Sequence, residues 1–212
     1  MRFLRIGCLA MATLLRAGAA PDVVVYISTN RLVSNAERVA TSIFADAGIS
    51  VTWHRGDPAK GASGSIVIPV TLSEQTPEDC PLDILAQSHP YAAADKGITV
   101  FYKKVRELAA NSLPEQLLLG HVLAHEIGHV LEGVDRHSQE GVMKARWSQK
   151  DFEEMQKAPL RFGPEDTDLL IYGLAARRQN AAPVMDAGRK NAAHGFVKGT
   201  GGRRLFTHSG AP

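Results

Sequence analysis

The first part of the chain alternates between short β-branched runs and one amphipathic segment. Residues 22–28 and 49–54 are rich in Val, Ile and aromatic side chains, whereas residues 35–47 place apolar side chains at intervals of three and four. This strand–helix–strand pattern predicts two parallel strands in a covered sheet, because a crossover helix joins them. Gly48 is expected to end the helix.

Two more strands are predicted, at residues 65–71 and 98–102. Pro69 cannot donate a hydrogen bond to a ladder, so the first of these is expected at a sheet edge or to end near the proline. A short irregular strand is expected near residues 84–88. The polar stretch 103–111 shows no clear element.

The longest predicted helix runs over residues 112–132. Ser112, Pro114 and Glu115 fit a capping box with proline in the first turn, and Gly133 is expected to stop the helix. Its apolar residues spread over most of the circumference, which predicts burial on more than one face. Shorter helices are expected to begin at Ser148, with Asp151 completing the cap, and to cover 164–179. Together these elements predict an α/β (α+β) fold with a small mixed sheet packed on helices.

The two ends of the chain differ from the middle in composition. Residues 1–20 carry basic, apolar and small-residue regions in the order of a secretory signal, and their apolar run is too short to span a bilayer. We therefore expect a folded domain over 21–180 and a basic, disordered tail over 181–212. The mature protein would be secreted or periplasmic, with no stable membrane anchor. Cys80 would be its only cysteine, which excludes an internal disulfide.

The charge distribution argues against a nucleic-acid partner. Of 24 basic residues, three precede residue 21 and five follow residue 180. Residues 21–180 therefore contain 16 basic and 21 acidic residues. The predicted domain is therefore acidic although the sequence pI is 8.6. A basic stripe that could follow phosphates is missing from its sequence.

The predicted long helix contains the sequence His125-Glu126-Ile127-Gly128-His129. Two histidines four residues apart lie on one helix face, where both imidazoles can reach one Zn²⁺ ion. Glu126 would lie beside the metal and accept a proton from its bound water. His121 continues the stripe, but 121 and 129 are about 12 Å apart along the axis, so one ion cannot bind all three. We interpret His121 as a core or supporting histidine.

The residues that follow suggest a third ligand. Gly133, His137 and Met143 resemble the metzincin metallopeptidases, whose pattern is H-E-x-x-H-x-x-G-x-x-H with a methionine turn downstream. Here the glycine comes one residue late and the histidine two. We interpret this as a longer turn that returns His137 to the metal. The alternatives are Asp135, at the nominal spacing, and a carboxylate of the next helix, Glu153 or Glu154.

The resemblance implies a zincin-like fold and a monomeric zinc metallopeptidase, an endopeptidase on a peptide or protein substrate. Zinc with His125, His129 and His137 would activate a water, Glu126 would serve as base and acid, and Met143 would form an apolar floor under the metal. An extended substrate would pair with residues 84–88 or 65–70. The alternatives are a non-catalytic zinc-stabilised binding module and a zinc amidase acting on a non-protein amide.

Overall fold

The computed structural model describes residues 22–29, 31–58, 65–81, 83–89, 97–110 and 112–181. The chain divides into two units, Met1–Ala182 and Pro183–Pro212, and every described residue belongs to the first. The predicted secretory signal lies outside the described residues, as does the predicted tail beyond Ala181. Among the described helices, none has the length and apolar character needed to cross a bilayer.

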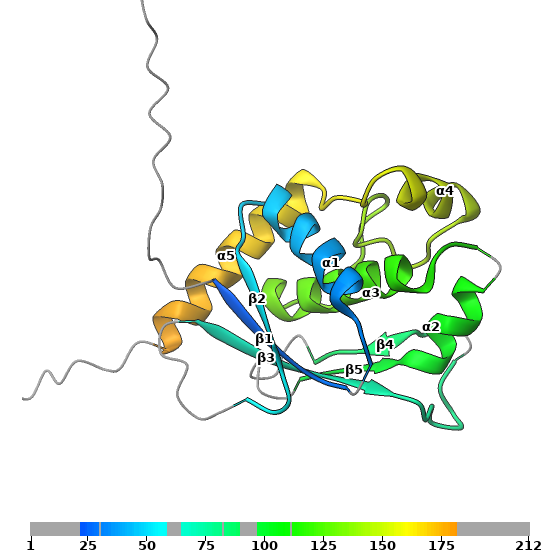
Figure 1. Ribbon diagram of the computed structural model, residues 1–212. Coiled ribbons are helices and arrows are strands. Elements are labelled where there is room, and N and C mark those ends of the chain that lie inside the picture. The colour runs from blue at the N-terminus through cyan, green and yellow to red at the C-terminus, as the bar shows by residue number, and fades with distance from the viewer. Residues whose placement is uncertain are drawn as a thin grey trace, which may run out of the picture. The chain divides into compact units, whose positions relative to one another are not determined.

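A five-stranded mixed sheet forms one layer of the fold (Figure 1). Its strands are β1 (Val23–Ser28), β2 (Val51–Arg55), β3 (Ile66–Ser73), β4 (Ala86–Gln87) and β5 (Ile98–Phe101). The spatial order is β2-β1-β3-β5-β4, with parallel pairing except between β4 and β5. The predicted parallel unit of β1 and β2 and the short strand near 84–88 are confirmed, and β4 is the antiparallel edge strand.

The prediction that Pro69 places its strand at an edge, or ends it, is wrong. β3 continues to Ser73 and pairs with β1 on one side and β5 on the other. Ile66 donates its N–H to the Asp22 carbonyl on the β1 side. The backbone groups of successive residues in a strand point to alternate sides, so the nitrogen of Pro69 points toward the β5 side. There β5 begins only at Ile98, opposite Val70. The proline therefore lies just before the ladder that it would otherwise interrupt.

Within the described ranges, five helices accompany the sheet: α1 (Ser34–Asp46), α2 (Tyr102–Ala109), α3 (Glu115–Glu132), α4 (Gln149–Lys157) and α5 (Pro164–Ala181). The mixed α/β class is therefore as predicted. Helix α2, which starts directly after β5, was not predicted from the sequence. Its buried residues Tyr102, Val105 and Ala109 follow helical spacing, but the charged residues between them obscured the pattern.

The predicted capping box at the start of α3 is also wrong. Pro114 occupies the N-cap position, with no side-chain capping hydrogen bond. Ser112 instead donates its N–H to Ala109 at the end of α2, and the Glu115 carboxylate accepts a hydrogen bond from the Tyr102 hydroxyl. By contrast, Ser148 and Asp151 form the predicted capping box of α4.

Helix α3 is the centre of the core, as its apolar circumference predicted. It packs against α1 and α5 (Figure 1). Most of its residues are buried. Glycines allow the close approach: a Cβ at Gly120 would lie 2.6 Å from the Val39 Cβ, and one at Gly173 of α5 would lie 1.8 Å from the Leu131 carbonyl oxygen. The histidine-bearing helix is therefore held rigidly by neighbours on several sides.

Candidate metal centre

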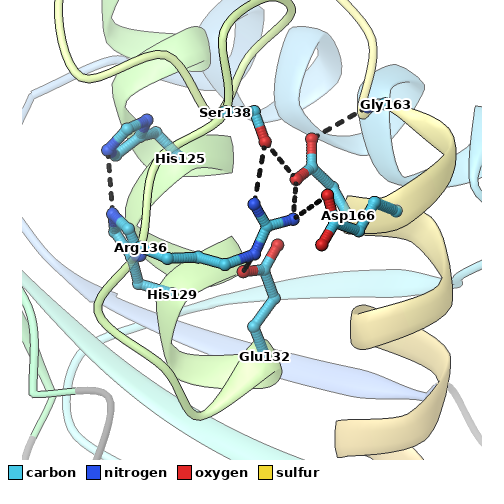
Figure 2. Close-up of polar contacts among 8 residues, drawn as sticks. His125, His129, Glu132, Arg136, Ser138, Gly163 and Asp166 are labelled. Carbon is cyan, nitrogen blue, oxygen red and sulfur yellow. Dashed lines mark hydrogen bonds and ion pairs between the residues drawn. The ribbon is translucent and has the colours of Figure 1, made fainter.

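Helix α3 brings His125 and His129 together, one turn apart. Their Nε2 atoms lie 3.0 Å from each other (Figure 2). His129 is only 5% exposed, whereas His125 is partly exposed. In a tetrahedral zinc site with Zn–N distances of about 2.0–2.1 Å, ligand nitrogens are separated by roughly 3.3 Å, so this pair is suitably spaced for one ion.

The third histidine returns to the pair from a loop. Gly133 ends α3 in the left-handed conformation with φ of 70°, and its N–H bonds the His129 carbonyl at 3.0 Å. The chain then reverses, and the ring of His137 stacks against that of His125 with centroids 5.3 Å apart. One ring nitrogen from each of His125, His129 and His137 lies within 4.8 Å of the other two. The two-residue longer spacing therefore does not prevent the three imidazoles from meeting.

The alternative third ligands do not join this group. Within the described part of the chain, the only metal-competent cluster is formed by the three histidines. Glu153 contacts Gln149, and Glu154 pairs with Lys150, both within α4. Asp135 is exposed, and its carboxylate interacts electrostatically with His129 and His137, but it is not one of the three clustered ligands. Three imidazole donors suit Zn²⁺ among the common divalent ions and leave a further coordination position.

His125 is oriented by the loop after His137. Its Nδ1 lies 2.9 Å from the Val142 carbonyl oxygen, an acceptor that requires the proton on Nδ1 and leaves Nε2 free. This loop is closed by the Ser138 N–H, which donates to the Met143 carbonyl at 2.8 Å. Metal-binding histidines usually donate their second ring N–H to an acceptor, as His125 does to Val142.

Met143 packs directly against the histidine-bearing helix. It is 1% exposed, and its Sδ lies 2.8 Å from the position that a Cβ on Gly128 would occupy. Gly128 therefore provides the space in which Met143 approaches α3 beside His129.

His121 is a core residue, as predicted. It is fully buried, with Nδ1 2.7 Å from the Leu117 carbonyl and Nε2 accepting the Leu160 N–H at 3.0 Å. Both ring nitrogens are therefore used inside the protein, and the ring stands edge-on to Trp147.

The electrostatics of the site favour neutral histidines. Burial lowers the pKa of His125, His129 and His137. Repulsion from neighbouring histidines lowers it further for His137 and for His129, whose pKa falls to about 4. Imidazoles that are neutral near pH 7 can bind a metal without first losing a proton.

Glu126 is perturbed in the opposite direction. Burial raises its pKa to about 7, while a hydrogen bond from Ser88 partly opposes the shift. A carboxyl group with a pKa near the working pH can both accept and release a proton.

Several residues of this site were not predicted from the sequence. Ser88 follows β4 and reaches Glu126, and Trp147 stands edge-on to His125 with centroids 5.8 Å apart. Asp166 bonds the residues on either side of His137. All three are distant from α3 in sequence, and no local pattern marks them.

No protein-family model matches the chain, and no curated protein matches it. Among solved structures, the chain is similar to a zinc-dependent peptidase from Methanocorpusculum labreanum, with 12% identity, a TM-score of 0.47, and coverage of 70% of this chain and 99% of that one.

Proposed function

We propose that this protein is a zinc-dependent peptidase with a metzincin-like site. The observation that carries the proposal is the convergence of His125, His129 and His137 next to Glu126, whose pKa is raised to about 7. Bound zinc would supply Lewis acidity, which polarises a carbonyl group and makes water more acidic. The three imidazoles would hold the ion, with His125 oriented by Val142.

Glu126 is the proposed proton carrier. Its side chain follows the first histidine, so it lies beside the ligand pair rather than between its members. Burial keeps its proton affinity high enough to accept a proton at neutral pH and later to give it to a leaving amine. Ser88 would fix the orientation of the carboxylate through its hydrogen bond.

Substrate binding is assigned to β4. Of the two segments considered from the sequence, β3 has neighbours on both sides, whereas β4 pairs only with β5 in the described sheet. An extended peptide can add to such an edge through main-chain hydrogen bonds. Ser88, one residue beyond β4, would bring that peptide close to Glu126. An endopeptidase acting outside the cytoplasm, as residues 1–20 suggest, is consistent with this mode.

The proposal is tested with the purified mature protein and an unfolded protein as substrate. Hydrolysis should require zinc and stop on addition of a chelator. Glu126→Gln should retain zinc and lose at least about 100-fold in kcat, because general acid–base catalysis typically supplies that much. Zinc binding without hydrolysis in the wild type would instead favour a non-catalytic module. Hydrolysis restricted to small non-peptide amides would favour an amidase.

A further inference from the structure

The loop that carries His137 is attached to a buried carboxylate of the last helix. Asp166 lies in the first turn of α5 and is 1% exposed. Its Oδ1 accepts hydrogen bonds from Arg136 Nη2, at 2.7 Å, and from the Ser138 hydroxyl (Figure 2). These two donors are the residues immediately before and after His137. One carboxylate oxygen therefore binds both chain neighbours of His137, the third candidate ligand.

The other oxygen of Asp166 keeps the carboxylate in place. Oδ2 accepts the Gly163 N–H at 2.9 Å, an orienting bond at the start of α5. Two residues earlier, the Arg161 carbonyl accepts the N–H of Val142 at 2.9 Å, and Val142 in turn orients His125. Residues 161–166 thus support His125 through Val142. They support His137 through its chain neighbours Arg136 and Ser138.

The charged groups around Asp166 are incompletely paired. Arg136 also lies 4.0 Å from the buried Glu132 and 3.7 Å from Glu165, which is 80% exposed. One guanidinium group therefore serves two buried carboxylates, and neither Glu132 oxygen has a hydrogen-bond partner. Buried ionic groups are generally neutral or unfavourable for stability compared with apolar packing, so a cluster of this kind suggests a geometric role.

We propose that Asp166 is a positioning residue for the metal centre, which acts by fixing the loop around His137. The inference rests on the metal ligands of the proposed function. Without the carboxylate, Arg136 and Ser138 lose their common acceptor, and His137 must be ordered when the metal binds. Loss of such outer-shell partners typically weakens metal binding by 10–100-fold.

The principal variant is Asp166→Asn. The side-chain oxygen of asparagine can still accept the Gly163 N–H. The NH2 group that replaces the other carboxylate oxygen is a donor, so it cannot accept hydrogen bonds from Arg136 and Ser138. Zinc affinity is measured by competition with a chromophoric chelator, well below the unfolding temperature. The Co²⁺-substituted proteins are compared by their visible absorption. We expect zinc affinity 10–100-fold below the wild type and a cobalt spectrum that differs from that of the wild type.

Two controls separate positioning from helix capping. Asp168→Asn changes an exposed carboxylate of the same helix and should leave both readouts unchanged. Ser138→Ala and Arg136→Gln remove the same contacts without touching the start of α5, so each should weaken zinc binding in the same direction. If Asp166→Asn does not fold, the zinc affinities of Ser138→Ala and Arg136→Gln test the proposal.

The outcomes distinguish this inference from the proposed function. A wild-type protein that does not bind zinc through its histidines overturns both. Wild-type zinc binding that is unchanged in Asp166→Asn overturns the positioning role alone. A loss of affinity that Ser138→Ala and Arg136→Gln do not share would make Asp166 a helix cap only, and would also overturn it.

Discussion

His125 Nδ1 lies 2.9 Å from the carbonyl oxygen of Val142, so a histidine of α3 is oriented by a loop seventeen residues further along the chain. The bond determines which ring nitrogen carries the proton. The remaining nitrogen, Nε2, faces the Nε2 of His129 at 3.0 Å. The ligand pair is therefore arranged before a metal arrives, and little reorganisation is needed on binding.

The three histidines should be individually necessary for tight zinc binding. Removing one of three protein ligands leaves two, which is too few for a stable catalytic site. We expect His125→Ala, His129→Ala and His137→Ala each to lose stoichiometric zinc, measured by metal analysis after dialysis against a weak chelator.

Glu153→Ala is the matched control. Asp135→Ala is a second control, which removes a carboxylate near the histidines that is not one of the clustered ligands, and both variants should retain one zinc per chain. Retention of zinc by His137→Ala, with loss in either control, would contradict the proposed ligand set.

His121→Ala should affect stability but not metal stoichiometry. Both of its ring nitrogens are bonded inside the core, so the substitution leaves the Leu117 carbonyl and the Leu160 N–H without their partner and opens a cavity. We expect a loss of about 2–4 kcal/mol in the free energy of unfolding by urea denaturation. A variant of normal stability that fails to bind zinc would place His121 in the metal site instead.

The sequence predicted the parts of this protein in which a local pattern determines the structure. The His125–His129 pair is set by helical periodicity, and the stop at Gly133 is set by the φ of 70° that glycine tolerates. Pro69 was placed wrongly because its cost depends on where the neighbouring strand begins. Asp166 was missed because its partners lie 28 and 30 residues away.

Alanine substitution of two glycines should destabilise the protein to different extents. A Cβ at Gly173 would lie 1.8 Å from the Leu131 carbonyl oxygen, and backbone cannot easily move. At Gly128 the nearest atom is Met143 Sδ, 2.8 Å away, at the flexible part of a side chain. Overpacking typically costs about 1–3 kcal/mol, so we expect Gly128→Ala in this range and Gly173→Ala above it.

Thermal unfolding of the two glycine variants, with chelator present, measures this difference. An equal or smaller effect of Gly173→Ala would show that α5 is not tightly packed on the end of α3.

Glu132→Gln should stabilise the metal-free protein increasingly as pH rises from 4.5 to neutral. Burial, with repulsion from Asp166, raises the pKa of Glu132 from 4.5 to about 7. The folded state therefore binds more protons than the unfolded state between these values, and the contribution of Glu132 to stability falls as pH rises through this range. Glutamine cannot ionise, so its advantage should be near zero below pH 4.5 and about 1–3 kcal/mol above pH 7.

Urea unfolding of wild type and Glu132→Gln at pH 4.5 and pH 8 tests this expectation. Because all other titrating groups are common to both proteins, they cancel in the difference. A difference that is the same at both pH values would show that Glu132 does not carry a buried charge.

The position of Asp166 on α5 has a consequence for the order of synthesis. A nascent chain acquires His125, His129 and His137 while residue 166 is still to be added, and Arg178 of the same helix pairs with Asp22 at the start of β1. Until α5 has emerged, the third histidine lacks its proposed anchor. If Asp166 anchors the loop around His137, the metal centre is complete only after the last helix has been synthesised.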